Sequence, residues 1–464
     1  MSNPIKHKDP EIPDDEPFKY CKLDRKKHAD TLTAIVESYA DGFVLALDSK
    51  WGTGKTTFVK MWKKELEKEP KSYKTIYFNA WENDFANEPL TALLGELNSI
   101  VGEKGEKYNS LVKKSVVIAK SVLPALAKGI ASKYLNTDTV LDVIEKSLEA
   151  TTEILEKEVD NYIEKKKNLV TFKTELEEYI KETCNNKPLI FFIDELDRCR
   201  PDYAVEVLEK VKHFFSVEGI VFVLSIDKIQ LSHSVQGYYG SYKIDSTEYL
   251  RRFIDLEYQL PEPESGLFCS YLYEYYKFHE FFDVESRTKN DFLQNDGDNF
   301  FLFTKDLFFN YKYTLRQQEK IFAHIRLTLK CFNLDYYLFP TTFLILIHLK
   351  YFNEDVYNNI KKKSLIIQNL INNIENIFIN VVETRYLIDA ETFLLTFYNN
   401  SLETQEVLIR KNGAIEELNL ITKLDQNDFL NHLKRFKPSL VASTISIDYL
   451  INKIDLLEPL ILIN

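Results

Sequence analysis

The sequence predicts an α/β fold built on a parallel β-sheet, on the basis of two observations. First, short continuous apolar runs recur in the first part of the chain, as expected of strands buried on both faces. The runs cover residues 42–47, 73–79, 188–193, 219–226 and 253–260. Second, amphipathic helical patterns lie between them, at 56–69 and 202–215. Strands that alternate with helices favour a parallel sheet covered on both faces.

Shifts in composition divide the chain into four regions. Residues 1–25 are polar and contain prolines, and they suggest a loosely held tail. The α/β core follows at 26–264 and holds a long insertion at 86–186. Beyond it glycines are few and aromatic residues many, which favours a helical, lid-like subdomain at 265–365 and a helical C-terminal domain at 366–464.

The second half of the insertion carries apolar residues at steps of three and four, with Glu and Lys between them. This period is typical of an amphipathic helix. Two interpretations stay open: a solvated helical hairpin packed on the core, or an arm that binds a partner.

The composition favours a folded protein of the cytoplasm. Hydrophobic residues make up 45% of the 464 positions, enough for a core without disulfides. The five cysteines include no CxxC pair, which indicates a reducing compartment. The most apolar stretch, Tyr336–Leu349, is too short to cross a bilayer, so we expect a buried helix there and no membrane partner. A net charge of −12 argues against non-specific coating of nucleic acid.

A glycine-containing turn follows the first expected strand and opens a helix, which is the context that a phosphate-binding loop requires. Its residues, all candidates for nucleotide contact, are Ser49, Lys50, Trp51, Gly52, Thr53, Gly54, Lys55, Thr56 and Thr57. Lys55 would reach the β- and γ-phosphates, and the Thr56 hydroxyl would bind Mg²⁺. Ser49 stands where the pattern GxxxxGK[ST] has its first glycine, and a plain strand–helix turn is the alternative.

Two carboxylates, Asp194 and Glu195, directly follow the apolar run at 188–193. At the carboxyl end of a parallel strand they would face the nucleotide. Asp194 can hold the Mg²⁺ shell through water, and Glu195 can orient and deprotonate the attacking water. Many strands end in an acid, so this catalytic interpretation depends on the pairing with the phosphate loop.

Five further residues are weaker candidates. Ser225 and Asp227 lie at the end of the run at 219–226 and could sit between the metal-holding strand and the γ-phosphate, or could simply cap the strand. Arg251 and Arg252 could reach a neighbouring subunit's γ-phosphate as catalytic residues, or form surface ion pairs. Arg316 could close a lid over the nucleotide, or be an ordinary exposed helix residue.

Other chemistries find no support. The eight histidines are scattered, with no HExxH and no Ser–His–Asp arrangement, so a metalloprotease or triad hydrolase is not indicated. No NKxD-type guanine selector follows the second acid, which favours ATP over GTP.

Four stretches together resemble the KAP family of P-loop NTPases. They are KWGTGKTTFVKMW at 50–62, IYFNAWEND at 76–84, FFIDELDRCRPDYAVEVLEKVKHFF at 191–215, and the segment from VFVLSID to FIDLEYQLP at 221–261. The resemblance implies a sheet of the additional-strand ATPase type, in the order 5-1-4-3-2. It also implies nucleotide and Mg²⁺ roles for Lys55, Thr56 and Asp194. Glu195 stands where the family more often has Asp. Asp197, Arg198 and the segment Asn79-Ala80-Trp81 match the family pattern too; their roles are less clear, and a structural role near the loop is the expected one.

The leading functional hypothesis is an ATP-driven, Mg²⁺-dependent switch. Family members in bacteria include phage-exclusion proteins and parts of antiviral gene clusters, so the resemblance implies a defence role with a co-encoded effector or a homo-oligomer as partner. Two alternatives stay open: a nucleotide-gated scaffold with little hydrolysis, and a nucleic-acid-stimulated motor, which the acidic balance disfavours.

Overall fold

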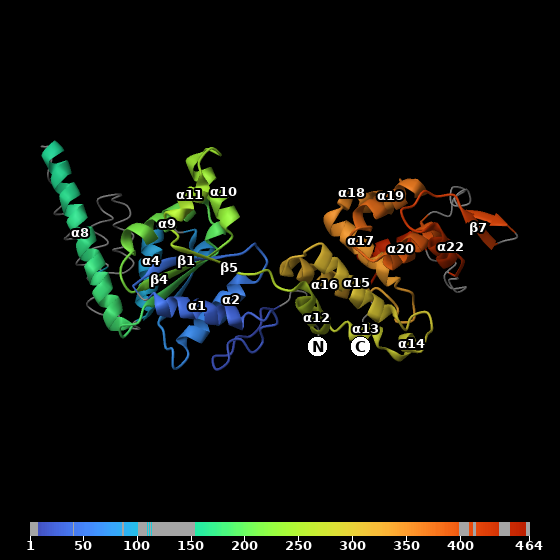
Figure 1. Ribbon diagram of the computed structural model, residues 1–464, viewed down its shortest axis with the longest axis horizontal. Helices are drawn as coiled ribbons and strands as arrows, with labels where there is room; N and C mark the ends of the chain where they lie inside the picture. The colour runs from blue at the N-terminus through green and yellow to red at the C-terminus, as the bar shows by residue number, and fades with distance from the viewer. Residues whose placement is uncertain are drawn as a thin grey trace. The chain divides into compact units, whose positions relative to one another are not determined.

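The computed structural model describes residues 8–39, 41–85, 88–100, 109, 111, 113, 154–398, 408–411, 414–435 and 446–460. The chain forms two compact units, one of residues 9–262 and one of residues 263–464 with the first eight residues. Figure 1 labels the elements of both. The finer division of the C-terminal region at residue 365 stays a prediction.

The first unit, residues 9–262, is built on a five-stranded sheet in the order β2-β3-β4-β1-β5, and every neighbouring pair is parallel. The strands are β1 (Phe43–Asp48), β2 (Thr75–Asn79), β3 (Leu189–Asp194), β4 (Ile220–Ile226) and β5 (Leu256–Gln259). All five expected strands are present. Read from the other edge the order is 5-1-4-3-2, so the predicted α/β fold class is confirmed.

Helices cover both faces of this sheet (Figure 1). One face packs on α1 (Lys26–Ser38) and α2 (Lys55–Glu67). The opposite face packs on α4 (Pro89–Leu97), α8 (Ile154–Thr183), α9 (Pro201–Phe214), α10 (Lys228–Tyr239) and α11 (Ser246–Arg251). Short turns complete the unit: α3 (Ala80–Asn83), η1 (Asn98–Ile100) and η2 (Leu196–Arg198).

The side chains of each strand alternate between these two cores, because successive residues of a strand point to opposite faces. In β3, Ile190 and Phe192 lie in the core under α1 and α2, whereas Phe191 and Ile193 lie in the opposite core. By the same alternation Asp194, at the end of β3, lies on the α2 face. The strand period therefore places this carboxylate on the side of the sheet from which α2 begins.

The segment before α1 is held more firmly than the sequence suggests. Phe18 is buried and its ring meets Phe58 of α2, with centroids 6.2 Å apart. Lys64 Nζ donates to the Ile12 carbonyl at 2.7 Å. Residues 9–25 of the expected tail therefore belong to the first unit, where Phe18 and the Ile12 carbonyl contact α2.

The insertion is described mainly through α8, which is helical over 154–183, whereas the start of the expected helical pattern at 140–153 lies outside the described residues. Phe172, Leu176 and Ile180 are buried in the core shared with α9. Most of 101–153 lies outside the described residues, so the hairpin and the partner-binding arm both stay predictions.

Where the structure describes it, the second unit, residues 263–464, is helical with one exception. Its helices are α12 (Ser265–Tyr275), α13 (His279–Phe282), α14 (Glu285–Thr288), α15 (Asp296–Asn310), α16 (Leu315–Leu329), α17 (Pro340–Phe352), α18 (Glu354–Lys361), α19 (Ile367–Phe378), α20 (Thr384–Phe397), α22 (Gln426–Arg435) and α23 (Ile447–Ile454). The exception is an antiparallel pair, β6 (Leu408–Lys411) and β7 (Ala414–Leu418), inside the region expected to be helical. The sequence does hold a hairpin signal there: Asn-Gly at 412–413 separates two strand-length segments.

The apolar stretch at 336–349 corresponds to α17, which is buried from Pro340 to Leu349, as expected of a core helix. Across the part of the chain that the structure describes, no helix has both the length and the apolar character that a bilayer crossing demands.

Candidate functional site

The turn between β1 and α2 curls tightly on itself. Gly52 and Gly54 have φ of 77° and 82°, in the left-handed region that favours glycine. The hydroxyl oxygens of Ser49 and Thr53 lie 2.8 Å apart, and Thr53 Oγ1 donates to the Lys50 carbonyl at 2.9 Å. Ser49 is not among the described residues with positive φ, so serine fits where the pattern usually has glycine.

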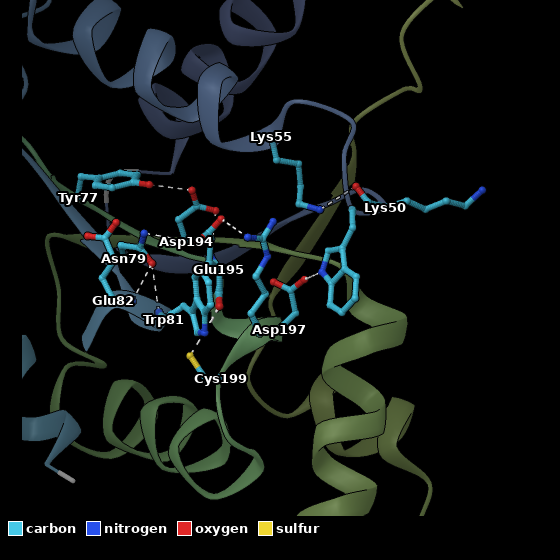
Figure 2. Close-up of polar contacts among 12 residues, drawn as sticks. Lys50, Lys55, Tyr77, Asn79, Trp81, Glu82, Asp194, Glu195, Asp197 and Cys199 are labelled. Carbon is cyan, nitrogen blue, oxygen red and sulfur yellow. Dashed lines mark hydrogen bonds and ion pairs between the residues drawn. The ribbon is translucent and has the colours of Figure 1, made fainter. Parts of the chain in front are cut away.

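Lys55, the first residue of α2, is buried with its ammonium inside this turn. Lys55 Nζ donates to the Ser49 carbonyl. It also donates to the Lys50 carbonyl at 3.1 Å (Figure 2). Burial lowers the pKa of Lys55, and nearby carboxylates oppose this change. The carboxylates are those of Asp197, Asp227, Asp194 and Asp48. A buried cation thus lies among acids from the ends of three adjacent strands.

Asp194 is buried at the end of β3, in register with Ser225 of β4. Tyr77 of β2 donates its hydroxyl to Asp194 Oδ2 at 2.9 Å, and the Glu195 N–H donates to Oδ1 at 3.0 Å (Figure 2). Ser225 Oγ is buried with no hydrogen-bond partner among the described residues. The structure therefore brings Asp194 and Ser225 to the sheet edge where Lys55 lies.

Glu195 has φ of 60°, a left-handed backbone that is unusual for a residue with a side chain. Its carboxylate pairs with Arg198 Nη1 at 2.8 Å and accepts from Asn79 Nδ2 at 3.4 Å. Burial raises the pKa of Glu195, and the Arg198 guanidinium partly offsets this rise. The Glu195 carboxylate is therefore engaged by two neighbours, and its role as the base stays a prediction.

Trp51 forms hydrogen bonds that connect the phosphate loop with residues that follow β3 and β4. Its indole N–H donates to Asp197 Oδ2, and its backbone N–H donates to Asp227 Oδ2 at 3.3 Å. Asp227 also caps α10 by accepting from Gln230 N. Burial raises the pKa of Asp197, while the bond from Trp51 lowers it. The loop is thus anchored on the residues that follow β3 and β4.

Three contacts of the site were not anticipated from the sequence. Asp48 ends β1 and accepts a hydrogen bond from Lys228 N at 2.9 Å. Its position directly after an apolar run could have indicated that it lies at the site. The hydroxyl of Tyr77, near the end of an expected strand, could have indicated a hydrogen bond to a neighbouring acid. Arg25 donates to the Gly54 carbonyl at 3.2 Å from before α1, and no sequence pattern indicates this contact.

The weaker candidates are placed differently. Arg251 pairs with Glu248 at 3.0 Å on the exposed surface of α11, and Arg252 follows it at the helix end. Arg316 lies in the first turn of α16, in the second unit. Thr56 and Thr57 lie half-buried in the first turn of α2. The catalytic and nucleotide roles of all these residues stay predictions.

The side chains at this site suit a metal ion that takes only part of its ligands from the protein and the rest from phosphate and water. Within the described ranges, no group of three or more His, Cys, Asp or Glu side chains is arranged to hold a metal ion. Mg²⁺ commonly takes one or two protein oxygens together with waters and phosphate oxygens. The Asp194 carboxylate and the Thr56 hydroxyl are oxygen donors of the kind that such a site needs, and their role as metal ligands stays a prediction.

A phosphate-binding loop between β1 and α2 of a 5-1-4-3-2 parallel sheet, with acids at the end of β3, defines a P-loop NTPase. Residues 25–387 match the KAP family P-loop domain, and the chain belongs to this family. Membership supports nucleotide binding and hydrolysis in general terms.

Individual relatives are distant. The uncharacterized protein MJ0182 of Methanocaldococcus jannaschii is 28% identical over 149 residues, which are 29% of this chain and 75% of that protein. Among solved structures, the Aeropyrum pernix ORC2 protein in ADPNP–ADP complexes is 14% identical, covers 97% of this chain and 95% of its own, and gives a TM-score of 0.34. Its ADP form is 13% identical over 83% and 88%, with the same TM-score of 0.34. Similarity at this level bears on neither mechanism nor partner.

Proposed function

We propose that this protein binds Mg·ATP and hydrolyses it as a nucleotide-driven switch. The observation that carries the proposal is the buried Lys55 ammonium, held by carbonyls of its own loop next to Asp194. A buried cation whose hydrogen bonds go only to neutral carbonyls is stabilised when anionic oxygens replace those carbonyls, because charge-assisted hydrogen bonds are stronger. Triphosphate is the anion whose recognition this loop and the α2 N-terminus favour.

Each residue then has a defined task. Lys55 and the loop N–H groups bind phosphate oxygens, while Asp194, with the Thr56 hydroxyl, holds the metal. Mg²⁺, when bound, neutralises charge on the phosphates. Glu195 accepts the proton of the attacking water, and its raised pKa brings it nearer to the working pH of a general base. Trp51 keeps the loop in position through Asp197.

A second candidate is a nucleotide-gated scaffold with little hydrolysis. The pairing of Glu195 with Arg198 and Asn79 favours it, because a base engaged with two neighbours is not free to take a proton. A binding assay beside a turnover assay separates the two: slow release of unchanged ATP supports the scaffold.

The biological setting is an extension of the same proposal. We expect a role in bacterial anti-phage defence, with a co-encoded effector or a second copy of the chain as partner, in the cytoplasm. A nucleic-acid-stimulated motor is the remaining alternative. ATPase rates of the wild type and of Lys55→Ala, each with and without co-encoded proteins and nucleic acids, test all three. A rate that rises only with nucleic acid supports the motor.

A further inference from the structure

The Tyr77 side chain lies on the same face of the sheet as the Asp194 carboxylate. β2 and β3 run parallel, with Tyr77 opposite Phe192. Two residues further along, Asn79 is opposite Asp194. Side chains two residues apart in a strand share a face, so Tyr77, Phe192 and Asp194 all lie on the α2 side. Tyr77 and Asp194 are therefore diagonal neighbours across the two strands, a separation that a long aromatic side chain can span.

The Tyr77 ring is held by packing while its hydroxyl reaches the site. The ring is half-buried against the core under α1 and α2, and Lys60 Nζ of α2 lies 5.5 Å from its centroid. The hydroxyl donates to Asp194 Oδ2 at 2.9 Å (Figure 2). A phenol is protonated at neutral pH, so it can supply this bond to an ionised carboxylate.

The hydrogen bonds of Asp194 fix the orientation of its carboxylate. Oδ2 accepts from Tyr77, and Oδ1 accepts from the Glu195 N–H at 3.0 Å. A carboxylate oxygen can accept about two hydrogen bonds, so each oxygen keeps capacity for a further partner. Asp194 is only 1% exposed, so bulk water does not compete for that capacity. The two bonds thus set the plane in which Asp194 can receive a metal ion or the water bound to one.

We propose that Tyr77 is a positioning residue for Mg²⁺, which it influences through Asp194. This inference rests on the proposed function, since it concerns the metal that accompanies ATP. A hydrogen bond that orients a metal ligand from outside the coordination shell is worth roughly 10–100-fold in metal affinity. Tyr77 needs no contact with nucleotide or metal for this effect. Its contribution should therefore show only when the metal is present, whereas a purely structural bond would matter with or without it.

Tyr77→Phe tests this directly, because it removes the hydroxyl and keeps the ring. Calorimetry with a non-hydrolysable ATP analogue, once in EDTA and once in saturating Mg²⁺, measures the gain in affinity that the metal provides. In Tyr77→Phe we expect this gain to fall about tenfold, while the affinity in EDTA stays within about twofold of the wild type. An undiminished gain overturns the proposal. An equal fall in both buffers also overturns it, because the hydroxyl would then serve the fold of the site.

Two further variants sharpen the test. Tyr73→Phe removes a phenol hydroxyl just before β2, at the opposite end of the strand, where Lys187 Nζ lies 5.5 Å from the ring centroid. It should keep the wild-type gain. Asp194→Asn should lose most of the gain by itself, and adding Tyr77→Phe should lower it no further, because residues that act as one unit are not additive. A reduced gain in Tyr73→Phe, or an additive loss in the double variant, contradicts the assignment.

Failure of the proposed function has a different signature. The wild type would then bind the analogue in neither buffer, or would bind it without any gain from Mg²⁺, and the role of Tyr77 would fall with it. A clear gain in the wild type that Tyr77→Phe retains overturns the role of Tyr77 alone. The measurement needs no turnover, so the same results are expected whether the protein hydrolyses ATP or holds it as a scaffold.

Discussion

The two units bury charge in opposite ways. In the first unit, Lys55 lies among carboxylates that gather at one edge of the sheet, around a turn built to receive an anion. Among the described residues of the second unit, several buried ionisable side chains form pairs or hydrogen bonds inside the core, as Arg287 does with Asp296, and Glu391 has no hydrogen-bond partner. The ligand site is thus marked by charges that cluster around the turn between β1 and α2. Burial of a charge alone does not mark such a site.

Arg287 illustrates the structural use of charge in the second unit. It is fully buried and contacts Asp296, donates to the carbonyls of Leu334 and Tyr336 at 3.0 and 2.9 Å, and stacks on Phe281 at 4.6 Å. These partners come from α13, α15 and the loop before α17, so the guanidinium joins several segments of the core. No comparable set of bonds to the protein occupies Lys55, whose contacts are carbonyls of one turn.

The largest expected effect is the loss of nucleotide binding in Lys55→Ala. Removing the ammonium takes away charge-assisted hydrogen bonds to phosphate, so affinity for Mg·ATP should fall about 100-fold or more. Calorimetry measures it. Lys63→Ala, on the same helix but paired with Glu67 at 2.6 Å, is the matched control and should bind as the wild type does. Undiminished binding in Lys55→Ala would remove the phosphate loop from the proposal.

Glu195→Gln should bind Mg·ATP normally but hydrolyse it about 100-fold more slowly or worse, because the amide cannot accept a proton. In the wild type, hydrolysis needs Glu195 deprotonated. Burial raises its pKa, so activity should be lost as pH falls through a window above the ordinary range of a glutamate. Rates from pH 5 to 9 check this, and wild-type turnover in Glu195→Gln would exclude it as the base.

The sheet and the phosphate loop were predictable because their signals are local. Each strand is a continuous apolar run, and residues 49–57 follow the first run directly, so Lys55 and Asp194 needed only the strand order to be brought together. The contacts that complete the site join residues far apart in the chain, such as Tyr77 to Asp194 or Arg25 to Gly54. Side-chain contacts of this kind leave no periodic pattern.

The second unit was predictable only in its class. Its helices follow from composition, but the antiparallel pair of β6 and β7 lies among them. The Asn-Gly dipeptide between the two segments is a local hairpin signal that an argument from composition alone overlooks. Burial of Glu391 could not be foreseen, since a lone acid in an apolar helix is normally exposed. Tertiary packing decides this burial.

A variant at Glu391 can show whether a buried carboxyl of the second unit lacks a compensating partner. Both its carboxyl oxygens are buried without a partner among the described residues, and burial raises its pKa to about 9. Above the ordinary pKa of a glutamate, the unfolded chain releases the proton of Glu391 while the folded chain keeps it. The free energy of unfolding therefore falls as the pH rises towards 9. Relative to the wild type, Glu391→Gln should gain ~3 kcal/mol in unfolding free energy between pH 5 and 7.

Denaturant unfolding at several pH values measures this gain. Glu383→Gln is the matched control, because Glu383 forms an exposed ion pair with Arg385 and should show no such trend. Parallel pH curves for wild type and Glu391→Gln would mean that the carboxyl finds a partner in the folded chain. In that case the second unit, like the first, would hold a compensated buried acid.

The smallest effect on stability is expected from Arg251→Ala. Its pair with Glu248 is exposed on both sides, 65% and 56%, and such pairs contribute at most about 0.5 kcal/mol to stability. If Arg251 instead reaches the nucleotide of a neighbouring copy, wild-type hydrolysis per chain should rise with protein concentration, and Arg251→Ala should lose that rise while keeping its Tm. Thermal unfolding and a concentration series separate the roles: a Tm several degrees lower would assign Arg251 to the fold, because an exposed pair that stabilises so little cannot account for it.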